Sequence, residues 1–290
     1  MVLDSSMKPG ERTRIIQASM GDYEQIADFL NNHIHIHRHL DWISSLEWIG
    51  KQPFLLEIAQ NSIIAMFCAV PDNEKVAWIR IFGVRHHKYV VPSWELLLSE
   101  AISQLRSMNI NRLATLVLHP WFKKLILYSE FEHLQDVIVL EWQGYLPEIE
   151  KQNDQIQIRH MQPEDLRAVT EIDHLAFSPL WQNTFEDFQK ACGLSGIMTV
   201  ATIKDQLVGY QISTNSAMGG HLARLAVLPE YQRMGIAFFL VHDLLEKFTR
   251  QECSKVTVNT QSDNKPSLAL YHKFGFRKTA EEIPVYELNF

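Results

Sequence analysis

Residues His221–Ala237, HLARLAVLPEYQRMGIA, predict a buried strand, a short loop and the start of a helix. Leu222–Val227 is almost wholly apolar, and Pro229 ends it because proline cannot continue the hydrogen bonding of a sheet. Ala237 begins the run AFFLVHDLLEKF, whose apolar residues have helical spacing. A strand that leads through a tight loop into a helix leaves unpaired N–H groups at the positive end of the helix dipole. The stretch therefore predicts a phosphate site.

A second motif lies downstream, in NKPSLALYHKFGF, residues Asn264–Phe276. Asn264 or Asp263 can cap a helix, and Pro266 suits its first turn. Gly275 can end the helix in the left-handed conformation that glycine tolerates. The motif predicts a short helix that carries Tyr271.

The two motifs together resemble the GCN5-related N-acetyltransferases, the GNAT family. The pattern Gln232-x-x-Gly235-x-Ala237 matches the acyl-CoA pyrophosphate loop of that family, and Asn264, Tyr271 and the Gly-Phe pair match its later motif. The resemblance implies an α/β fold with a mixed sheet. It also implies an acyl-CoA-dependent N-acyltransferase that uses acetyl-CoA as co-substrate and requires no metal.

The two halves of the chain repeat each other with one offset. Four pairs of corresponding residues differ by 143 positions: Asp22 and Asp165, Val84 and Val227, Arg112 and Lys255, Tyr128 and Tyr271. A long-period repeat indicates a duplicated unit. We therefore expect two tandem GNAT-like domains, residues 1–147 and 155–290, each a mostly antiparallel twisted sheet flanked by helices, joined by a linker at 148–154.

The same offset predicts that the N-terminal copy is degenerate. The positions equivalent to Gln232, Gly235, Ala237 and Asn264 hold Tyr89, Pro92, Trp94 and Trp121. Proline offers no N–H to a phosphate and cannot take the backbone angles of glycine, and tryptophan would crowd the loop. We expect no acyl-CoA in this copy, although Tyr128 is retained opposite Tyr271.

The resemblance also implies roles for residues of the C-terminal copy. The backbone of the central strand would pair with the pantetheine arm, the loop would bind the pyrophosphate, and the second motif would contribute further contacts. The expected cofactor-binding residues are Leu225, Ala226, Val227, Gln232, Arg233, Met234, Gly235, Ile236, Ala237, Asn264 and Ser267. Tyr271 would protonate the leaving thiolate. The general base stays open among His221, Glu230, Tyr286 and a water chain.

Composition limits the partners. The 290-residue chain is 46% hydrophobic and 21% charged, with a formal net charge of −7, which argues against a nucleic-acid surface. No apolar run is long enough for a membrane span. Three cysteines without metal-like spacing suggest reduced thiols in a cytoplasm. The oligomeric state cannot be read.

Other features are expected to be structural. His33, His35, His37 and His39 alternate, and on a helix they would form two neighbouring pairs able to hold zinc. We expect instead a polar helix or loop at the surface, with a role in acceptor contact as the alternative. Aromatic residues in the equivalent stretches of the two halves are expected in the core or at the domain interface: Trp42, Trp48, Phe177 and Trp181.

The predicted function is transfer of an acetyl group from acetyl-CoA to a primary amine, by direct attack in the C-terminal domain. One alternative is an acyl-CoA-binding sensor or scaffold without turnover. Another is a tandem transferase similar to the mycothiol synthases, or one that uses aminoacyl-tRNA, which the acidic charge disfavours. The acceptor is open.

Overall fold

The computed structural model describes residues 13–71, 73–149, 154–194, 196–216, 219–253 and 255–290. The chain divides into two compact units: the first comprises the chain up to His133 together with Tyr286–Phe290, and the second comprises Leu134–Val285. Most of the predicted linker, residues 150–153, lies outside the described residues.

The first unit contains seven strands and three α-helices among its described residues. The strands are β1 Arg14–Gln17, β2 His35–Arg38, β3 Phe54–Ala59, β4 Ser62–Cys68, β5 Ala77–Trp78, β6 Ile81–Val84 and β7 Arg112–Leu116. The helices are α1 Tyr23–Asn32, α2 Val90–Ser107 and α3 Pro120–Tyr128, with 3-10 turns η1 Met20–Asp22, η2 Ser45–Trp48 and η3 His87–Tyr89. Five strands form an antiparallel sheet in the order β1-β3-β4-β6-β2.

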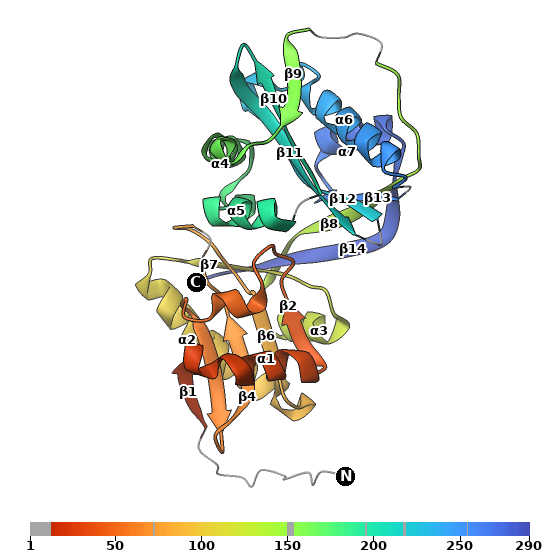
Figure 1. Cartoon of the computed structure of the whole chain (residues 1–290). Coiled ribbons are helices and arrows are strands. Elements are labelled where there is room, and N and C mark those ends of the chain that lie inside the picture. Colours follow the sequence, from red (N-terminus) through yellow and green to blue (C-terminus); the bar gives the residue numbers. More distant parts are fainter. Residues whose placement is uncertain (1–12, 72, 150–153, 195, 217–218, 254) are drawn as a thin grey trace. The chain divides into compact units, whose positions relative to one another are not determined.

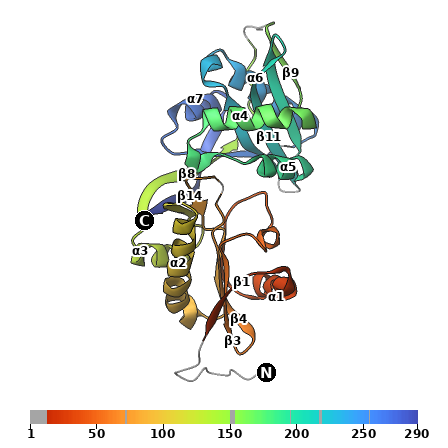
Figure 2. The same ribbon diagram turned by 90° about the vertical axis from the view of Figure 1, so that its left-hand side faces the viewer.

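Alternation along the strands explains the layers of this unit. Leu55 and Phe67 point to a core shared with α2 and α3, while Leu56 and Met66 point to a second core shared with α1. Because successive strand residues face opposite sides, α1 covers one face of the sheet and α2 the other (Figure 2).

Among its described residues, the second unit contains β9 to β13 and four α-helices. The strands are β9 Ile156–His160, β10 Ile197–Ile203, β11 Gln206–Ser216, β12 Gly219–Val227 and β13 Val256–Gln261. The helices are α4 Leu166–Ala176, α5 Phe185–Leu194, α6 Ile236–Arg250 and α7 Lys265–Lys273, with turns η4 Pro163–Asp165, η5 Pro179–Trp181 and η6 Pro229–Tyr231. Within this unit the sheet order is β14-β8-β13-β12-β11-β10-β9, and α4 and α5 lie on the opposite side of it from α6 and α7 (Figure 1).

Two strands carry the chain across the division. β8, Glu132–Trp142, follows α3 in sequence but pairs antiparallel with β13, with Leu140 opposite Val258. β14, Phe276–Asn289, ends in the first unit, where the N–H of Phe290 donates to the carbonyl O of Asn111. The compact units therefore differ from the domains expected at 1–147 and 155–290.

The predicted α/β fold with a mixed sheet is confirmed, and the element order repeats along the chain. α1 begins at Tyr23 and α4 at Leu166, and 166 − 23 = 143, the offset of the sequence repeat. The two halves differ at β2, whose counterpart by the same offset is the 3-10 turn η5.

Two of the alternating histidines, His35 and His37, lie in strand β2, so the expectation of a surface helix or loop was wrong for them. A strand places every second residue on one face, and His37 points inward, fully buried and stacked on Phe122 with ring centroids 4.0 Å apart. Burial lowers the pKa of His37 to about 3 and that of His39 well below its usual value. Both rings are therefore neutral at physiological pH.

We expect acid to destabilise the first unit through these two histidines. Their pKa values are lower in the folded chain, so the unfolded chain binds more protons below pH 6.5 and stability falls as the pH falls. For His37 the loss at pH 5 is about 2 kcal/mol, and His39 acts in the same direction. Urea unfolding at pH 7.5 and 5.0 measures the loss.

The matched variants are His37→Phe, which keeps a ring against Phe122, and His160→Gln at an exposed position. His37→Phe should lose about 2 kcal/mol of the pH dependence, and His160→Gln should retain it. An unchanged pH dependence in His37→Phe would show that His37 is not the titrating group.

Candidate active site

Strand β12 is paired on both edges over only part of its length. On one edge β11 pairs with it antiparallel as far as Val227, with a bulge at Ala223. On the other edge β13 pairs with it in parallel only as far as Leu222. Beyond Leu222 no strand among the described residues pairs with the backbone donors and acceptors of this second edge. The predicted residues Leu225, Ala226 and Val227 lie in this open part.

The loop after β12 enters α6 through two left-handed residues. Arg233 has φ 63° and Gly235 has φ 89°, a region that favours glycine. The first helical hydrogen bond joins the N–H of Phe239 to the carbonyl O of Gly235 at 3.0 Å. The N–H groups from Ile236 to Phe238 therefore have no carbonyl partner within the helix, and no side chain of the described residues caps it.

The side chains around this loop leave its backbone accessible. Gln232, Arg233, Met234 and Gly235 are exposed, Ala237 is half-buried and Ile236 anchors the helix in the core. The amide Nε2 of Gln232 donates to the carbonyl O of Val227 at 3.3 Å, which ties the loop to the end of β12. The open strand edge and the open helix N-terminus thus follow each other along the chain.

Tyr271 lies in α7 and is 4% exposed, packed against Phe276 with ring centroids 5.6 Å apart. Burial alone raises the pKa of its hydroxyl above the ordinary value, so the group stays protonated at neutral pH. Asn264 caps α7: its Oδ1 accepts from the N–H of Ser267 at 3.2 Å, and its Nδ2 donates to Oε1 of Gln261 at 3.4 Å. Gly275, at φ 77°, ends this motif in the predicted conformation.

The three candidates for the base lie in different surroundings. His221 is on β12 itself, half-buried, with Nδ1 2.9 Å from Oγ1 of Thr257, and burial lowers its pKa. Glu230 is exposed in η6. Tyr286 packs in the core of the first unit and stacks edge-on against His133. Of the three, only His221 lies on the strand whose edge is open.

Sequence reasoning missed a buried polar group beside this strand. Asp173 of α4 is fully buried and accepts from the Nε of Arg224 at 2.7 Å and from the hydroxyl of Tyr210 at 2.5 Å. The signal was present in the sequence, because Arg224 is the one charge in an otherwise apolar strand. A buried arginine needs a paired carboxylate, so a partner in α4 could have been sought.

Comparison with known proteins agrees with this geometry. The Acetyltransferase (GNAT) family matches residues 166–276. An N-alpha-acetyltransferase MAK3 of Arabidopsis thaliana is 36% identical over 70 residues, which are 24% of this chain and 36% of that protein. This family match lies wholly within the second unit. It begins with α4 and ends at Phe276, so it includes the open strand, the loop and Tyr271.

Two further relatives define the limits of the GNAT likeness. N-alpha-acetyltransferase 30 of Schizosaccharomyces pombe is 26% identical over 82 residues, covering 27% of this chain and 55% of that protein. The chain thus spans about a third to a half of the curated relatives it matches. A tandem GNAT protein from the clavulanic acid biosynthesis pathway matches 96% of this chain and 98% of its own, with TM-score 0.65 and 12% identity. The whole chain therefore has a tandem GNAT fold.

The first unit lacks the open strand edge of the second unit. By the offset of 143, Ile81–Val84 of β6 corresponds to Arg224–Val227 of β12. In the first unit β2 pairs antiparallel along this same segment, with Ile36 opposite Gly83. In the first unit, β2 thus occupies the edge of β6 that corresponds to the open edge of β12.

Aromatic side chains fill the rest of the corresponding region. Trp94 is 1% exposed, donates its Nε1–H to Oγ of Ser129 at 2.7 Å, and contacts Phe82 and Phe122 edge-on. Tyr128, the counterpart of Tyr271, is instead 66% exposed, and its hydroxyl donates to Glu95 at 3.1 Å. The two tyrosines thus share a sequence position but not an environment.

Among the described residues, no group of three or more His, Cys, Asp or Glu side chains is arranged to hold a metal ion. His33, His35, His37 and His39 are thus not grouped in this way. Within the same described residues, no helix is both long and apolar enough to cross a bilayer.

Proposed function

We propose that the second unit transfers the acetyl group of acetyl-CoA to a primary amine, with no covalent enzyme intermediate. The observation that carries the proposal is the open edge of β12, which runs directly into the exposed N–H groups at the start of α6. An extended pantetheine arm would add to the open edge as an extra strand. The pyrophosphate would bind the N–H groups of the loop and helix.

The chemistry follows from where the thioester would lie. Open N–H groups of β12 would stabilise the negative charge that develops on the carbonyl oxygen when the amine attacks. A C–N bond forms, the C–S bond breaks, and the amine loses one proton. The hydroxyl proton of Tyr271 passes to the sulfur as the bond breaks. Because the raised pKa makes the hydroxyl a weak acid, this transfer is coupled to C–S cleavage.

We propose His221 as the group that takes the amine proton, directly or through water. Its lowered pKa keeps the ring neutral at physiological pH. The Thr257 hydroxyl donates to the carbonyl O of Gly220 at 3.5 Å, so its oxygen can accept from Nδ1 of His221 and leave Nε2 with a free lone pair.

The direct test is an acceptor screen that detects the free thiol of CoA, run beside calorimetry with acetyl-CoA. Because the curated relatives are N-alpha-acetyltransferases by name, one arm is a peptide with a free N-terminal amine. A second arm is the same peptide with a blocked terminus and a free lysine, and others are a polyamine and an amino sugar. Binding of acetyl-CoA without turnover in any arm would favour the sensor or scaffold function.

We expect one acetyl-CoA to bind per chain. β2 occupies the edge of β6 in the first unit, and proline and tryptophan stand at Pro92 and Trp94, where the GNAT loop has Gly235 and Ala237. Calorimetry of the full chain measures the stoichiometry. A value of two, reduced to one by Gly235→Pro, would mean that the first unit also binds the cofactor.

A further inference from the structure

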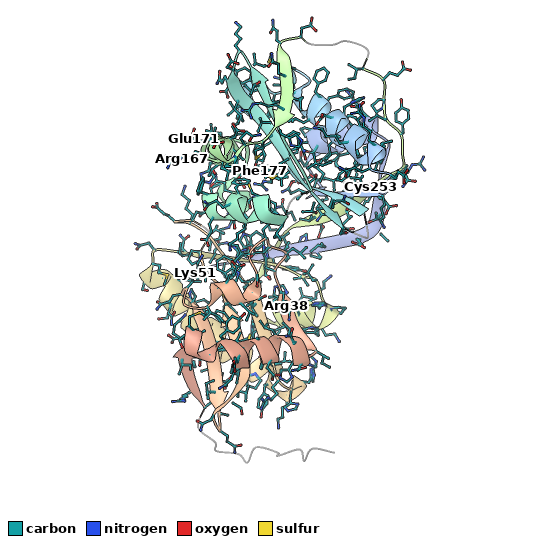
Figure 3. All side chains as sticks on the ribbon, viewed as in Figure 1. Arg38, Lys51, Arg167, Glu171, Phe177 and Cys253 are labelled. Carbon is teal, nitrogen blue, oxygen red and sulfur yellow. The ribbon has the colours of Figure 1, made fainter. Side chains whose placement is uncertain are left out.

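The segment from Phe177 to Asn183, between α4 and α5, is attached to β12 through one buried ion pair. Asp173 and Arg224 pair at 2.7 Å, with 0% and 13% of their side chains exposed. The other charged residues of α4, such as Arg167 and Glu171, are exposed and point outward (Figure 3). Asp173 is thus the acidic side chain that α4 directs into the unit.

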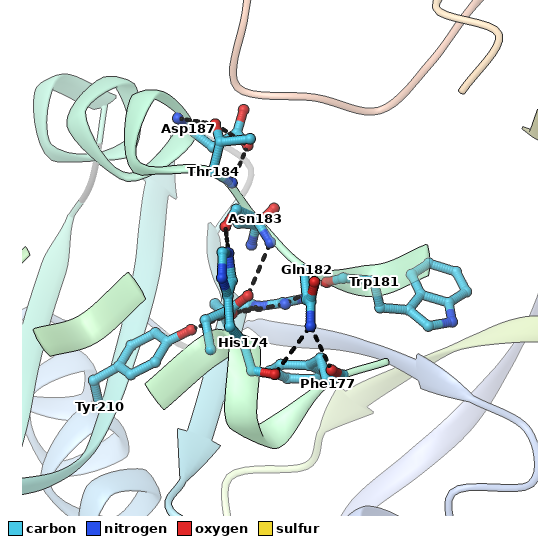
Figure 4. A network of polar contacts seen from close by, with 10 residues as sticks. His174, Phe177, Trp181, Gln182, Asn183, Thr184, Asp187 and Tyr210 are labelled. Carbon is cyan, nitrogen blue, oxygen red and sulfur yellow. Dashed lines mark hydrogen bonds and ion pairs between the residues drawn. The ribbon is translucent and has the colours of Figure 1, made fainter. Parts of the chain in front are cut away.

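Every oxygen of the Asp173 carboxylate is engaged. Oδ2 accepts from Arg224 and from the hydroxyl of Tyr210, and Oδ1 accepts from the N–H of Asn183 at 2.8 Å (Figure 4). A carboxylate that is fully buried and saturated in this way cannot approach a substrate amine or take its proton. Asp173 therefore acts through the groups it holds.

Arg224 extends the attachment to the segment itself. Its Nη2 donates to the carbonyl O of Trp181, and its guanidinium lies 3.6 Å from the ring centre of Phe177. Gln182 closes the turn, since its Nε2 donates to the carbonyl oxygens of His174 at 2.9 Å and Phe177 at 3.1 Å. Three points of the segment, at Phe177, Trp181 and Asn183, are fixed to two charged side chains.

Arg224 lies at the point of β12 where the pairing with β13 has ended. Arg224 follows the bulge at Ala223, where β12 leaves β13 and its edge becomes open. The same residue thus lies where the thioester would enter and holds two half-buried aromatic residues, Phe177 and Trp181. Through Arg224, the segment therefore lies beside the start of the open part of β12.

We propose that Asp173, Arg224 and Tyr210 are positioning residues, which hold the Phe177–Asn183 segment as one wall of the acceptor site. This inference rests on the proposed function, because it assumes that the open edge of β12 binds acetyl-CoA. The network sets how the acceptor amine is presented. The acceptor would then be recognised by the aromatic side chains of Phe177 and Trp181, because the charges of Asp173 and Arg224 neutralise each other.

The decisive variant replaces both charges at once, Asp173→Leu with Arg224→Met. Removing one partner would bury an unpaired charge and risk the fold, whereas exchanging a buried pair for apolar residues is often neutral or stabilising. Tyr210→Phe is the milder variant, which removes one donor and keeps the ring. The matched control is Arg159→Met, which breaks the two-bonded ion pair with Asp165 outside the segment.

Hydrogen exchange and steady-state kinetics give independent measurements on the full chain. In the double variant we expect exchange at Asn183 and its neighbours to rise at least tenfold. The KM for the amine found active in the acceptor screen should also rise at least tenfold, while the Kd for acetyl-CoA stays within twofold. Tyr210→Phe should shift both in the same direction by less, and Arg159→Met should shift neither.

Faster exchange with an unchanged acceptor KM would overturn the proposal, as would unchanged exchange in the double variant. A change in the Kd for acetyl-CoA equal to that in acceptor KM would also overturn it, because the network would then shape the whole site. If the wild type acetylates no amine in the screen, the proposed function fails, and the positioning role falls with it. The exchange data would then still report whether the network holds the segment.

Discussion

Tyr271→Phe is expected to lower kcat by about 10² to 10⁴, the effect typical of removing a positioned proton donor. The substitution keeps the ring and its contact with Phe276, and no hydrogen bond to a described residue is lost with the hydroxyl. The fold and the binding of acetyl-CoA should therefore change little. The loss falls on the transition state, so kcat and kcat/KM should decrease together.

The chain contains its own control for this variant. Tyr128 is the counterpart of Tyr271 by the repeat but is 66% exposed on α3, so Tyr128→Phe should leave turnover unaltered. Calorimetry with acetyl-CoA should give the same Kd for both variants and the wild type. If Tyr271→Phe keeps most of the activity, the tyrosine is a packing residue and water protonates the thiolate.

Much of the backbone conformation at the candidate site could be predicted because it depends on residues that are close in sequence. The proposed phosphate loop needs a left-handed residue between a strand and a helix, and Gly235, at φ 89°, has that conformation. Asn264 caps α7 for a similarly local reason. In both cases the residue type and its neighbours in sequence fix the backbone conformation.

The features that escaped prediction depend on partners far apart in the chain. The alternating histidines of β2 have helical neighbours at four residues and strand neighbours at two, and only pairing with β6 decides between these spacings. The segment Ala77–Val84 is divided into two strands, β5 and β6, because β5 pairs with β7 and β6 pairs with β4. The network of Asp173 joins residues 37 and 51 positions apart.

The degenerate copy illustrates the same distinction. The loss of the loop at Pro92 and Trp94 could be read from the sequence, since proline lacks the N–H and tryptophan lacks the space. The pairing of β2 along the edge of β6 could not be read from the sequence, because more than 40 residues separate the two strands. The sequence thus predicted which copy would not bind acyl-CoA, and strand pairing shows that β2 lies along the corresponding edge of the first unit.

Gly235→Pro is expected to weaken acetyl-CoA binding at least tenfold, which corresponds to about 1.4 kcal/mol. Proline removes the N–H of residue 235 and cannot adopt its φ of 89°, so the backbone at the start of α6 must change conformation. Calorimetry with acetyl-CoA measures the loss, and circular dichroism checks that the variant is folded.

Two graded variants separate the causes of that loss. Gly235→Asn keeps the N–H and is among the side chains that best tolerate the left-handed region; its Cβ would lie 3.5 Å from the ring of Phe239, an ordinary contact. It should bind acetyl-CoA more tightly than Gly235→Pro.

Arg233→Gly keeps the positive φ of residue 233 and removes only the side chain, so it reports the contribution of that charge. If Gly235→Pro is folded and binds acetyl-CoA like the wild type, the pyrophosphate does not bind at this loop, and the cofactor must be sought elsewhere in the second unit.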